Sequence, residues 1–466
     1  MTPEQLEELL RTRPSDERTY NRELPDPAMR RVPVRVSGSG LPMGWAAVAL
    51  VVGLVAVVGT TTFGPWQHGP AAAAPSASTT ASRGAFSATG SMNATRQQAS
   101  ATLLKDGRVL VVGGYDVSGF STNLATAPSA ELYDPATGKF TVTGSPHVAG
   151  VPVISVLLKD DRVLVIGCDA TGVCASSLAD VYDPSTGLFS AIGPIIGGCV
   201  SCTATLLNDG RVLVARGGDL SLNVEPSLLF DPATDTYATT GSMTTARIGQ
   251  TATLLSDGRV LIAGGNDGTL ANTLATAELY DPKTGTFGPT GSMTTARAGQ
   301  TATLLSDGRV LIAGGSDRTL IAGGVDSTGK ISTDKILDST ELYDPKTGTF
   351  SPAGSMTTAR GSQTATLLSD GRVLIAGGIR TPNVVTGRVL IAGGVGYAEV
   401  DGQGGAGVLA SAELYDPRTG TFSPAGSMTT ARSSQTATLL SDGRVLIAGG
   451  SDSSLNPLSS AELYQP

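Results

Sequence analysis

The chain has 466 residues, of which 60 are glycine and only 5% are aromatic. This composition is unusual for a globular enzyme and suits many short strands joined by tight turns. The formal net charge is −8, and lysine and arginine are scattered outside the N-terminal segment, so no nucleic-acid partner is expected. Only two histidines, His68 and His147, and four cysteines are present, which limits the catalytic chemistry available to the chain.

The N-terminal part of the chain divides into three segments of different composition. Residues 1–41 are polar and carry seven arginines and no lysine. Residues 42–64 include about twenty consecutive uncharged residues, enough for a helix to span a hydrocarbon core of about 30 Å. Residues 65–83 are rich in proline, alanine, serine and threonine, so we expect a flexible tether there.

We predict that the apolar segment is a single transmembrane helix. The only tryptophans of the chain, Trp45 and Trp66, flank it, and indole rings favour the membrane interface. Three arginines precede it closely, whereas the next positive charge after it is Arg83, so residues 1–41 are expected in the cytoplasm and the remainder outside. The alternatives are a signal peptide cleaved near Ala71–Ala77 and a buried core helix.

Seven similar units follow from residue 84 onward. Each contains a run such as TATLL, an Asp-Gly turn (Asp-Asp in the second unit), a run such as RVLIAGG, a variable loop, a run such as AELYDP and one such as TGTF. Asp-Gly is the strongest two-residue hairpin signal, so each unit predicts a four-stranded antiparallel meander with strands a to d. A sheet this small cannot bury its own faces, so the units must stack on one another. The second residue of this turn marks each unit: Gly107, Asp161, Gly210, Gly258, Gly308, Gly371 and Gly443.

Two further features recur in the units. A double glycine ends strand b, as at Gly264 and Gly265, and a tyrosine lies in strand c, as at Tyr280. In these features the sequence resembles the Kelch repeat over about residues 84–466. The resemblance implies an all-β fold, a β-propeller. Kelch units usually carry tryptophan in strand d, where this chain has phenylalanine or tyrosine, as at Phe287.

The two ends of the repeat region complement each other. The last unit stops at AELYQP without a strand d, and the first is preceded by an orphan segment, GAFSATGSM, at residues 84–92. This segment matches TFSPAGSM at residues 421–428. We therefore predict that strand 84–92 completes the last blade, with Phe86 near Tyr464, and closes a ring of seven blades.

Alternating strand direction gives the predicted propeller two different faces. The constant face carries the nearly invariant DG and DPxTG turns. The variable face carries the b–c and d–a loops, the longest of which are residues 316–339 and 379–411. Because binding residues concentrate on variable loops, we expect the variable face to bind a ligand.

Charged residues recur at the variable face. In five units an arginine begins strand a and a glutamate begins strand c. The pairs are Arg96 and Glu131, Arg247 and Glu278, Arg297 and Glu341, Arg360 and Glu413, and Arg432 and Glu462. Blade 2 has Gly150 and Asp180 at these positions, and blade 3 has Cys199 and Leu228. This parallel change favours structural Arg–Glu pairs, with a ligand-binding ring of arginines as the alternative.

An aspartate follows the double glycine in many units. These aspartates are Asp116, Asp219, Asp267, Asp317 and Asp452. Their spacing is poor for a calcium cage, so capping of Asx-type turns is favoured. The five arginines, with Asp267, Asp317 and Asp452, are the candidate binding residues.

The four cysteines gather on the variable face of blades 2 and 3. They are Cys168, Cys174, Cys199 and Cys202. In an extracytoplasmic domain we expect two disulfides among them. A zinc site with four thiolates and a CxxC redox centre at Cys199 and Cys202 are the alternatives.

Galactose oxidase is a Kelch-type propeller, and its copper site needs histidines beside tyrosines and a cysteine. The two isolated histidines cannot build such a site, so no metal, other cofactor or catalytic residue is predicted. We expect a membrane-anchored, extracytoplasmic module that binds a protein or polysaccharide. The alternatives are a carbohydrate-active enzyme without copper, since carboxylates are plentiful, and a sensor that signals through residues 1–41.

Overall fold

The computed structural model describes residues 84–116, 129–148, 153–168, 177–195, 199, 202–217, 224–267, 272–317, 336–380, 407–454 and 456–466. The predicted cytoplasmic segment, transmembrane helix and tether lie outside these residues. Within the described ranges, no helix has both the length and the apolar character needed to cross a membrane. The chain divides into two units, Met1–Ser76 and Ala77–Pro466, and the second, which is compact, contains all the structure described below.

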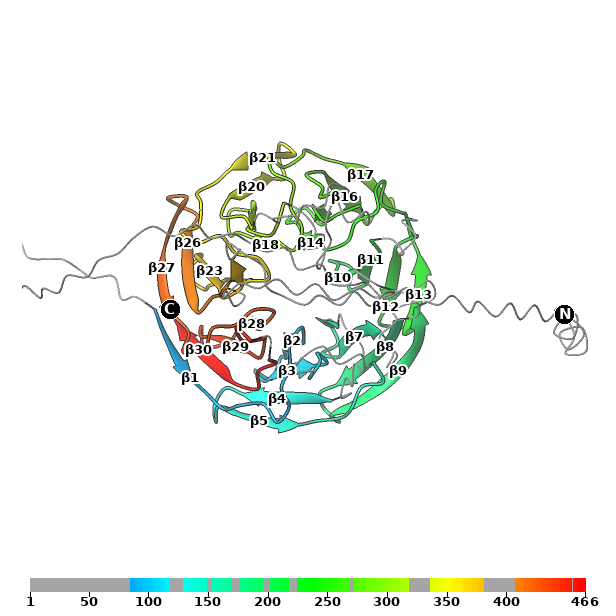
Figure 1. Cartoon of the computed structure of the whole chain (residues 1–466). Coiled ribbons are helices and arrows are strands. Elements are labelled where there is room, and N and C mark those ends of the chain that lie inside the picture. The colour runs from blue at the N-terminus through cyan, green and yellow to red at the C-terminus, as the bar shows by residue number, and fades with distance from the viewer. Residues whose placement is uncertain are drawn as a thin grey trace, which may run out of the picture. The chain divides into compact units, whose positions relative to one another are not determined.

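The second unit contains seven four-stranded antiparallel sheets arranged as a ring of blades (Figure 1). Within each blade the strands follow one another from a, nearest the axis, to d at the periphery. Blade 1 contains β2 (Ser100–Leu103), β3 (Val109–Val112), β4 (Ala130–Asp134) and β5 (Lys139–Val142). Blade 2 contains β6 (Ile154–Leu157), β7 (Val163–Cys168), β8 (Ser177–Asp183) and β9 (Leu188–Ile195). Blade 3 contains β10 (Thr203–Leu206), β11 (Val212–Ala215), β12 (Leu228–Asp231) and β13 (Thr236–Thr239).

The remaining blades repeat this order. Blade 4 contains β14 (Thr251–Leu254), β15 (Val260–Ala263), β16 (Ala277–Asp281) and β17 (Thr286–Pro289). Blade 5 contains β18 (Thr301–Leu304), β19 (Val310–Ala313), β20 (Thr340–Asp344) and β21 (Thr349–Pro352). Blade 6 contains β22 (Thr364–Leu367), β23 (Val373–Ala376), β26 (Ser411–Asp416) and β27 (Thr421–Ser427). Blade 7 contains β28 (Thr436–Leu439), β29 (Val445–Ala448) and β30 (Ala461–Gln465), with β1 (Ala85–Ala88) as its strand d.

The predicted ring closure is confirmed. Strand β1 pairs antiparallel with β30, and Phe86 lies opposite Tyr464 in the register. Their ring centroids are 4.9 Å apart. The strand is shorter than the predicted segment 84–92, because after Ala88 the chain turns toward blade 1. The seven-bladed, all-β architecture is therefore built from both ends of the repeat region.

The core lies between adjacent blades. Side chains alternate across a strand, so strand b presents two residues to each neighbouring blade. Leu261 and Ala263 of β15 pack against Val310 and Ile312 of β19, and all four side chains are buried. Each strand b is accordingly apolar throughout, and burial of both of its faces makes the stacking of blades the main source of hydrophobic stabilisation.

The Asp-Gly sequences form hairpins, but with three residues in the loop rather than two. In blade 4 the backbone N–H of Leu255 donates to Arg259 O at 2.8 Å, and that of Gly258 donates to Leu255 O at 3.0 Å. Gly258 has a φ of 88°, as expected when a type I turn is followed by a left-handed residue. The serine before the aspartate thus belongs to the loop and not to strand a.

A small extra sheet lies at the base of the longest loop. Strand β24 (Ile379–Arg380) pairs with β25 (Gly407–Val408) between β23 and β26 of blade 6. The segment between these two strands, which carries a spare copy of LIAGG, lies outside the described residues, as does the spare copy in blade 5.

Candidate functional site

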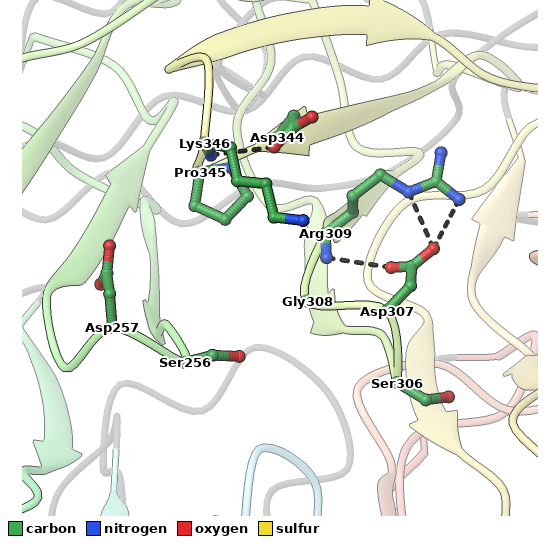
Figure 2. Close-up of a pocket in the computed structure, with 9 residues that line it drawn as sticks. All are labelled: Ser256, Asp257, Ser306, Asp307, Gly308, Arg309, Asp344, Pro345 and Lys346. Atoms are coloured by element: carbon green, nitrogen blue, oxygen red, sulfur yellow. Dashed lines mark hydrogen bonds and ion pairs between the residues drawn. The ribbon is translucent and has the colours of Figure 1, made fainter.

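The constant face contains two hollows that lie between neighbouring blades. Figure 2 shows the one between blades 4 and 5, with a volume of about 620 Å³. Its lining residues come from two DG turns and one DP turn: Ser256, Asp257, Ser306, Asp307, Gly308, Arg309, Asp344, Pro345 and Lys346. The other hollow, of about 560 Å³, lies at the equivalent place between blades 1 and 2. Both hollows are therefore products of the repeat.

Arginine–aspartate pairs within the DG turns form the polar rim of these hollows. Arg309 donates through Nε to Asp307 Oδ2 at 2.8 Å, and its backbone N–H donates to Asp307 Oδ1 at 3.0 Å. Burial alone would raise the pKa of Asp307, but these hydrogen bonds and the charge of Arg309 bring that pKa below its usual value. Both charges are neutralised within the turn, so the hollow offers paired donors and acceptors rather than a net charge.

Some of these arginines also join one blade to another. Arg259 Nη2 donates to Pro345 O of blade 5 at 3.4 Å, and Arg444 Nη2 donates to Pro135 O of blade 1 at 3.1 Å. The second bond crosses the junction between the first and last units. The turns of the constant face therefore have nearly the same sequence in every unit for a structural reason, because they connect adjacent blades.

The variable face contains the five predicted Arg–Glu pairs, and all five are buried ion pairs. Arg297 Nη2 lies 3.0 Å from Glu341 Oε1, with the two side chains 0% and 2% exposed. Arg297 Nη1 also donates to Gly314 O at 3.0 Å and to Ser339 O at 2.9 Å. The arginine lies in the d–a loop, ahead of strand a rather than within it. It thus connects that loop to the ends of strands b and c.

The other four pairs repeat this geometry. Their guanidinium–carboxylate distances are 3.1 Å for Arg96–Glu131 and 3.0 Å for Arg247–Glu278, Arg360–Glu413 and Arg432–Glu462. Burial lowers the pKa of each arginine, and the adjacent glutamate opposes that effect. These guanidinium groups have structural partners, and ligand binding by the arginines stays a prediction.

Each glutamate is also a cap for a loop. Glu341 accepts the backbone N–H groups of Thr294 at 2.7 Å and Thr295 at 3.1 Å. Two oxygen atoms thus satisfy one arginine and two buried backbone donors. The double glycine completes the arrangement, because Gly315 N–H donates to Arg360 O of the next blade at 2.9 Å. A Cβ on Gly314 would lie 2.4 Å from the same carbonyl oxygen, so only glycine permits this close approach.

Blade 2 keeps the carboxylate but lacks the arginine, and a histidine three residues before the arginine position contacts the carboxylate instead. Asp180 Oδ2 accepts the backbone N–H groups of His147 and Val148 at 2.7 and 3.2 Å. His147 Nδ1 lies 2.8 Å from Asp180 Oδ1. The carboxylate is fully buried, whereas the imidazole is 59% exposed. Gly150, at the arginine position, lies outside the described residues.

Blade 3 replaces both partners. Cys199 and Cys202 form a disulfide ahead of strand β10, and both cysteines are buried. This bond joins two of the four cysteines among which two disulfides are predicted. The side chain of Cys168 and the whole of Cys174 lie outside the described residues. The disulfide between Cys199 and Cys202 stands where blades 4 to 7 have the arginine and a glutamine, so a covalent link takes the place of their polar contacts.

The predicted aspartates take part in loop contacts. Asp452 Oδ1 accepts the backbone N–H groups of Ser454 at 2.8 Å and Asn456 at 2.9 Å, the geometry of a side-chain-capped turn. Asp267 Oδ2 accepts a hydrogen bond from Asn272 Nδ2 at 2.6 Å. Asp317 is half-buried in its loop, and Asp116 accepts a hydrogen bond from Thr95. Asp219 lies outside the described residues.

Strand a of every blade borders the axis of the ring (Figure 1). Ser100 and Thr102 of β2 hydrogen-bond to Ser155 of β6 through their hydroxyl groups, at 2.7 and 2.6 Å. In blades 3 to 7 strand a has the sequence TATL, with threonines at the corresponding positions. The seven strands thus contribute hydroxyl and aliphatic side chains, and no ionisable ones, to the axial wall.

Sequence reasoning missed several of these contacts. The hydroxyl of a strand-c tyrosine hydrogen-bonds to a threonine that follows strand d of the preceding blade, as in Thr290 Oγ1 to Tyr343 Oη at 2.9 Å. The threonine of TGSM was the available signal. The constant-face hollows gave no signal, because their residues occur in every unit. In the sequence, Arg216 is unusual only by comparison with the other units, because they have glycine at this position.

Known proteins share this fold. Residues 298–357 match the family model of the Kelch motif. No protein among the curated sequences matches the chain. A similar solved structure is a fungal alcohol oxidase of the AA5 family in complex with copper, with 16% sequence identity and a TM-score of 0.62 over 82% of this chain and 76% of that chain. At this identity the similarity shows the fold alone. The Kelch resemblance and the propeller fold are confirmed.

Proposed function

We propose that this Kelch-type propeller is displayed outside the cell by one membrane-spanning helix and acts as a binding module for a polysaccharide or a protein. The uncharged segment at residues 42–64, its flanking tryptophans and the arginines before it support the anchor and its orientation. The tether at residues 65–83 would hold the module away from the membrane surface.

The contacts of the recurring charged side chains favour a binding module over an enzyme. The charged side chains that recur from blade to blade are engaged in structural contacts, as in the Arg297–Glu341 pair and the Asp307–Arg309 pair. General acid–base catalysis needs two groups whose environments set different roles for them. Blades 4 to 7 instead present almost identical pairs, and their axial wall consists of threonine and aliphatic side chains. Repetition of this kind suits a surface that makes several equivalent contacts.

The copper of the AA5 alcohol oxidase has no matching donor set in this chain. The whole sequence has two histidines, and one of them, His147, lies beside the carboxylate of Asp180. The strand-c tyrosines, such as Tyr280 and Tyr343, are fully buried between blades. The residues present therefore do not fit a copper site of histidine and tyrosine ligands, and we derive no copper chemistry for this protein.

The anchor and its orientation can be tested in intact cells. The full-length chain would carry one epitope tag at the N-terminus and another at the C-terminus, and a protease would be added from outside. We expect loss of the C-terminal tag, protection of the N-terminal tag, and retention of the protein in washed membranes. Protection of both tags would contradict the proposed orientation, and release of the propeller into the medium would favour a cleaved signal peptide.

The binding function can be tested with arrays of polysaccharides and surface proteins probed with the full-length protein. Two variants then identify the face used: Asp452→Asn on the variable face and Lys346→Ala on the constant face, where Lys346 is exposed at the rim of the hollow in Figure 2. We expect the variable-face change to weaken binding. Release of new reducing ends from a bound polysaccharide would instead favour the carbohydrate-active enzyme.

A further inference from the structure

Blade 3 differs from the other blades at four positions that lie together at the variable face. Compared with blade 4, cysteines replace the arginine and the glutamine ahead of strand a, an arginine replaces the first glycine after strand b, and a leucine replaces the glutamate of strand c. The four residues of blade 3 are Cys199, Cys202, Arg216 and Leu228. Blade 3 thus keeps a guanidinium group in this region but supplies it from the residue after strand b rather than from the d–a loop.

The guanidinium of Arg216 reaches the same backbone position that its counterparts reach. Arg216 Nη1 donates to Pro226 O at 3.3 Å. Pro226 precedes Leu228 by two residues, as Thr276 precedes Glu278, and Arg247 Nη1 donates to Thr276 O at 2.8 Å. The relocated arginine therefore points toward the start of strand c, where the other blades have a carboxylate.

In blade 3 the guanidinium has only a loose ion pair with a carboxylate from outside strand c. Glu225 Oε2 lies 3.6 Å from Arg216 Nη2, beyond hydrogen-bonding distance, and Glu225 is 34% exposed. Among the residues that the structure describes, Arg216 Nε and Nη2 have no hydrogen-bond partner, although the side chain is only 6% exposed. In blade 4, by contrast, Arg247 donates through both Nε and Nη2 to Glu278 Oε1, at 3.2 and 3.0 Å. Within the described ranges, Arg216 is thus the one arginine of this set with two unsatisfied donors, whereas Arg432 has one, at Nε.

An unsatisfied guanidinium at this depth needs an acceptor. Arginine keeps its proton even when burial lowers its pKa, so Arg216 carries a positive charge and unused N–H groups at neutral pH. Its planar fork matches the two oxygens of a carboxylate, and a charge-assisted hydrogen bond is about twice as strong as a neutral one. Pro226 is exposed and Glu225 partly so, which leaves the site adjacent to solvent at the rim of the blade.

We propose that Arg216 forms a binding site for a carboxylate of the ligand, which takes the place of the glutamate that blade 3 lacks. The ligand carboxylate accepts hydrogen bonds from Nε and Nη2 of Arg216, and the side chain of Glu225 moves aside into solvent. The proposal deepens the proposed binding function by naming an acidic polysaccharide, one that contains uronic acid residues, as the ligand class.

Calorimetric titration of the full-length protein with glucuronate tests the site, with glucose as the neutral counterpart. We expect glucuronate to bind and glucose to bind at least tenfold more weakly. In Arg216→Gly the repeat's own glycine is restored, so the blade should fold, and glucuronate affinity should fall about tenfold or more. Arg418→Gln, at an arginine that is 78% exposed on the constant face, serves as the matched control and should bind as the wild type does. Equal affinity in Arg216→Gly and wild type would overturn the proposal.

A second variant supplies the missing carboxylate from within the chain. Leu228→Glu places a glutamate where Glu278 stands in blade 4, so it should raise the melting temperature and abolish glucuronate binding. In the Arg216→Gly background the same substitution buries an uncompensated charge and should lower the melting temperature. A decrease of equal size in both backgrounds would show that the guanidinium does not face this position, and would overturn the proposal.

The binding module and the carboxylate site at Arg216 can be disproved separately. If the protein binds a neutral polysaccharide but not glucuronate, the binding module stands and the carboxylate site is wrong. If glucuronate binds through Arg216 but no polysaccharide or protein binds, the site stands and the proposed function is wrong. Binding of sulfate in preference to glucuronate would contradict the assignment of a carboxylate.

Discussion

Arg297 illustrates how this fold stabilises a fully buried charge. Its guanidinium donates to one carboxylate oxygen, one serine hydroxyl and three backbone carbonyls, and Glu341 in turn accepts two backbone N–H groups. Such a pair gains little over an apolar contact, but removal of one partner leaves the other buried without compensation. The pair is therefore better understood as fixing the position of the d–a loop than as a large source of stability.

Substitution of Arg297 separates this structural role from a ligand-binding role. We expect Arg297→Ala to reduce the free energy of unfolding by about 3–5 kcal/mol, because Glu341 then stays buried without a cation. Urea denaturation measures the change, and Arg418→Ala, at an exposed pair, should alter stability by about 0.5 kcal/mol or less. Unchanged stability combined with lost ligand binding would instead support an arginine that serves a ligand.

Ala353 marks a position where the repeat lacks a hydrogen bond. In the preceding connection Thr290 bonds to the hydroxyl of Tyr343, but Ala353 cannot do so for Tyr415, whose buried hydroxyl has no partner. We expect Ala353→Thr to raise the free energy of unfolding by about 1 kcal/mol. There is space for the threonine side chain. A Cβ built on Gly420 meets no atom within 4 Å, whereas at the equivalent place in the preceding connection a Cβ built on Gly348 meets Thr290 Oγ1 at 3.2 Å.

The reverse substitution is the control for Ala353. Thr290→Ala should lower the free energy of unfolding by about 1–3 kcal/mol, since it leaves the Tyr343 hydroxyl buried without a partner. Chemical denaturation of both variants under the same conditions gives the comparison. A destabilised Ala353→Thr protein would indicate that the threonine methyl group does not fit beside Gly420.

At the scale of the elements, the sequence was most informative where units could be compared with one another. The parallel change at the arginine and glutamate positions in blades 2 and 3 predicted the buried pairs correctly. The same comparison identified Cys199 as unusual but did not identify Arg216, because an arginine beside two glycines is typical of an exposed loop. Only its burial and its two unused donors distinguish it. The number of loop residues in the DG hairpins was also missed, since the serine before the aspartate fits either a strand or a turn.

The aspartates of the DG turns should make the stability of the constant face sensitive to acid. Six of their aspartates have a pKa below the usual value: Asp106, Asp209, Asp257, Asp307, Asp370 and Asp442. In the first five, burial would raise the pKa, and hydrogen bonds and charge from the arginine two residues later outweigh it. In Asp442 the side-chain hydrogen bond from Arg444 is the largest effect.

The direction of these shifts fixes the pH dependence of stability. An aspartate has a pKa of about 3.9 in an unfolded chain, and its stabilising contribution is complete above that value. The contribution is lost as the pH falls through the lower pKa of the folded state. Urea midpoints measured from pH 7 to pH 3 should therefore decline below about pH 4. Asp442→Asn should show a shallower decline, and a stability that did not change below pH 4 would contradict this account.

For the propeller as a whole, the blade number followed from the sequence because the repeat region has one extra strand at its N-terminal end and lacks one at its C-terminal end. The orphan segment at residues 84–92 and the incomplete last unit allow only one closure, and β1 supplies it. The long loops of blades 5 and 6 differ in length and sequence from all others, so no comparison between units could predict their conformation. For the same reason, the ligand could not be inferred from the repeats that define the fold.

The closure of the ring makes the stability of the propeller depend on its first strand. A chain that begins at Gly84 keeps β1 and should unfold with the same midpoint as the full-length propeller. A chain that begins at Thr89 lacks β1, so Tyr464 loses its contact with Phe86 and β30 becomes an exposed edge. We expect this chain to lose about 2 kcal/mol or more of unfolding free energy, because it lacks the partly buried Phe86 ring and the pairing of β1 with β30, and to associate at higher concentration. Calorimetry and light scattering measure both effects. Equal midpoints for the two chains would show that the remaining blades hold the ring without β1.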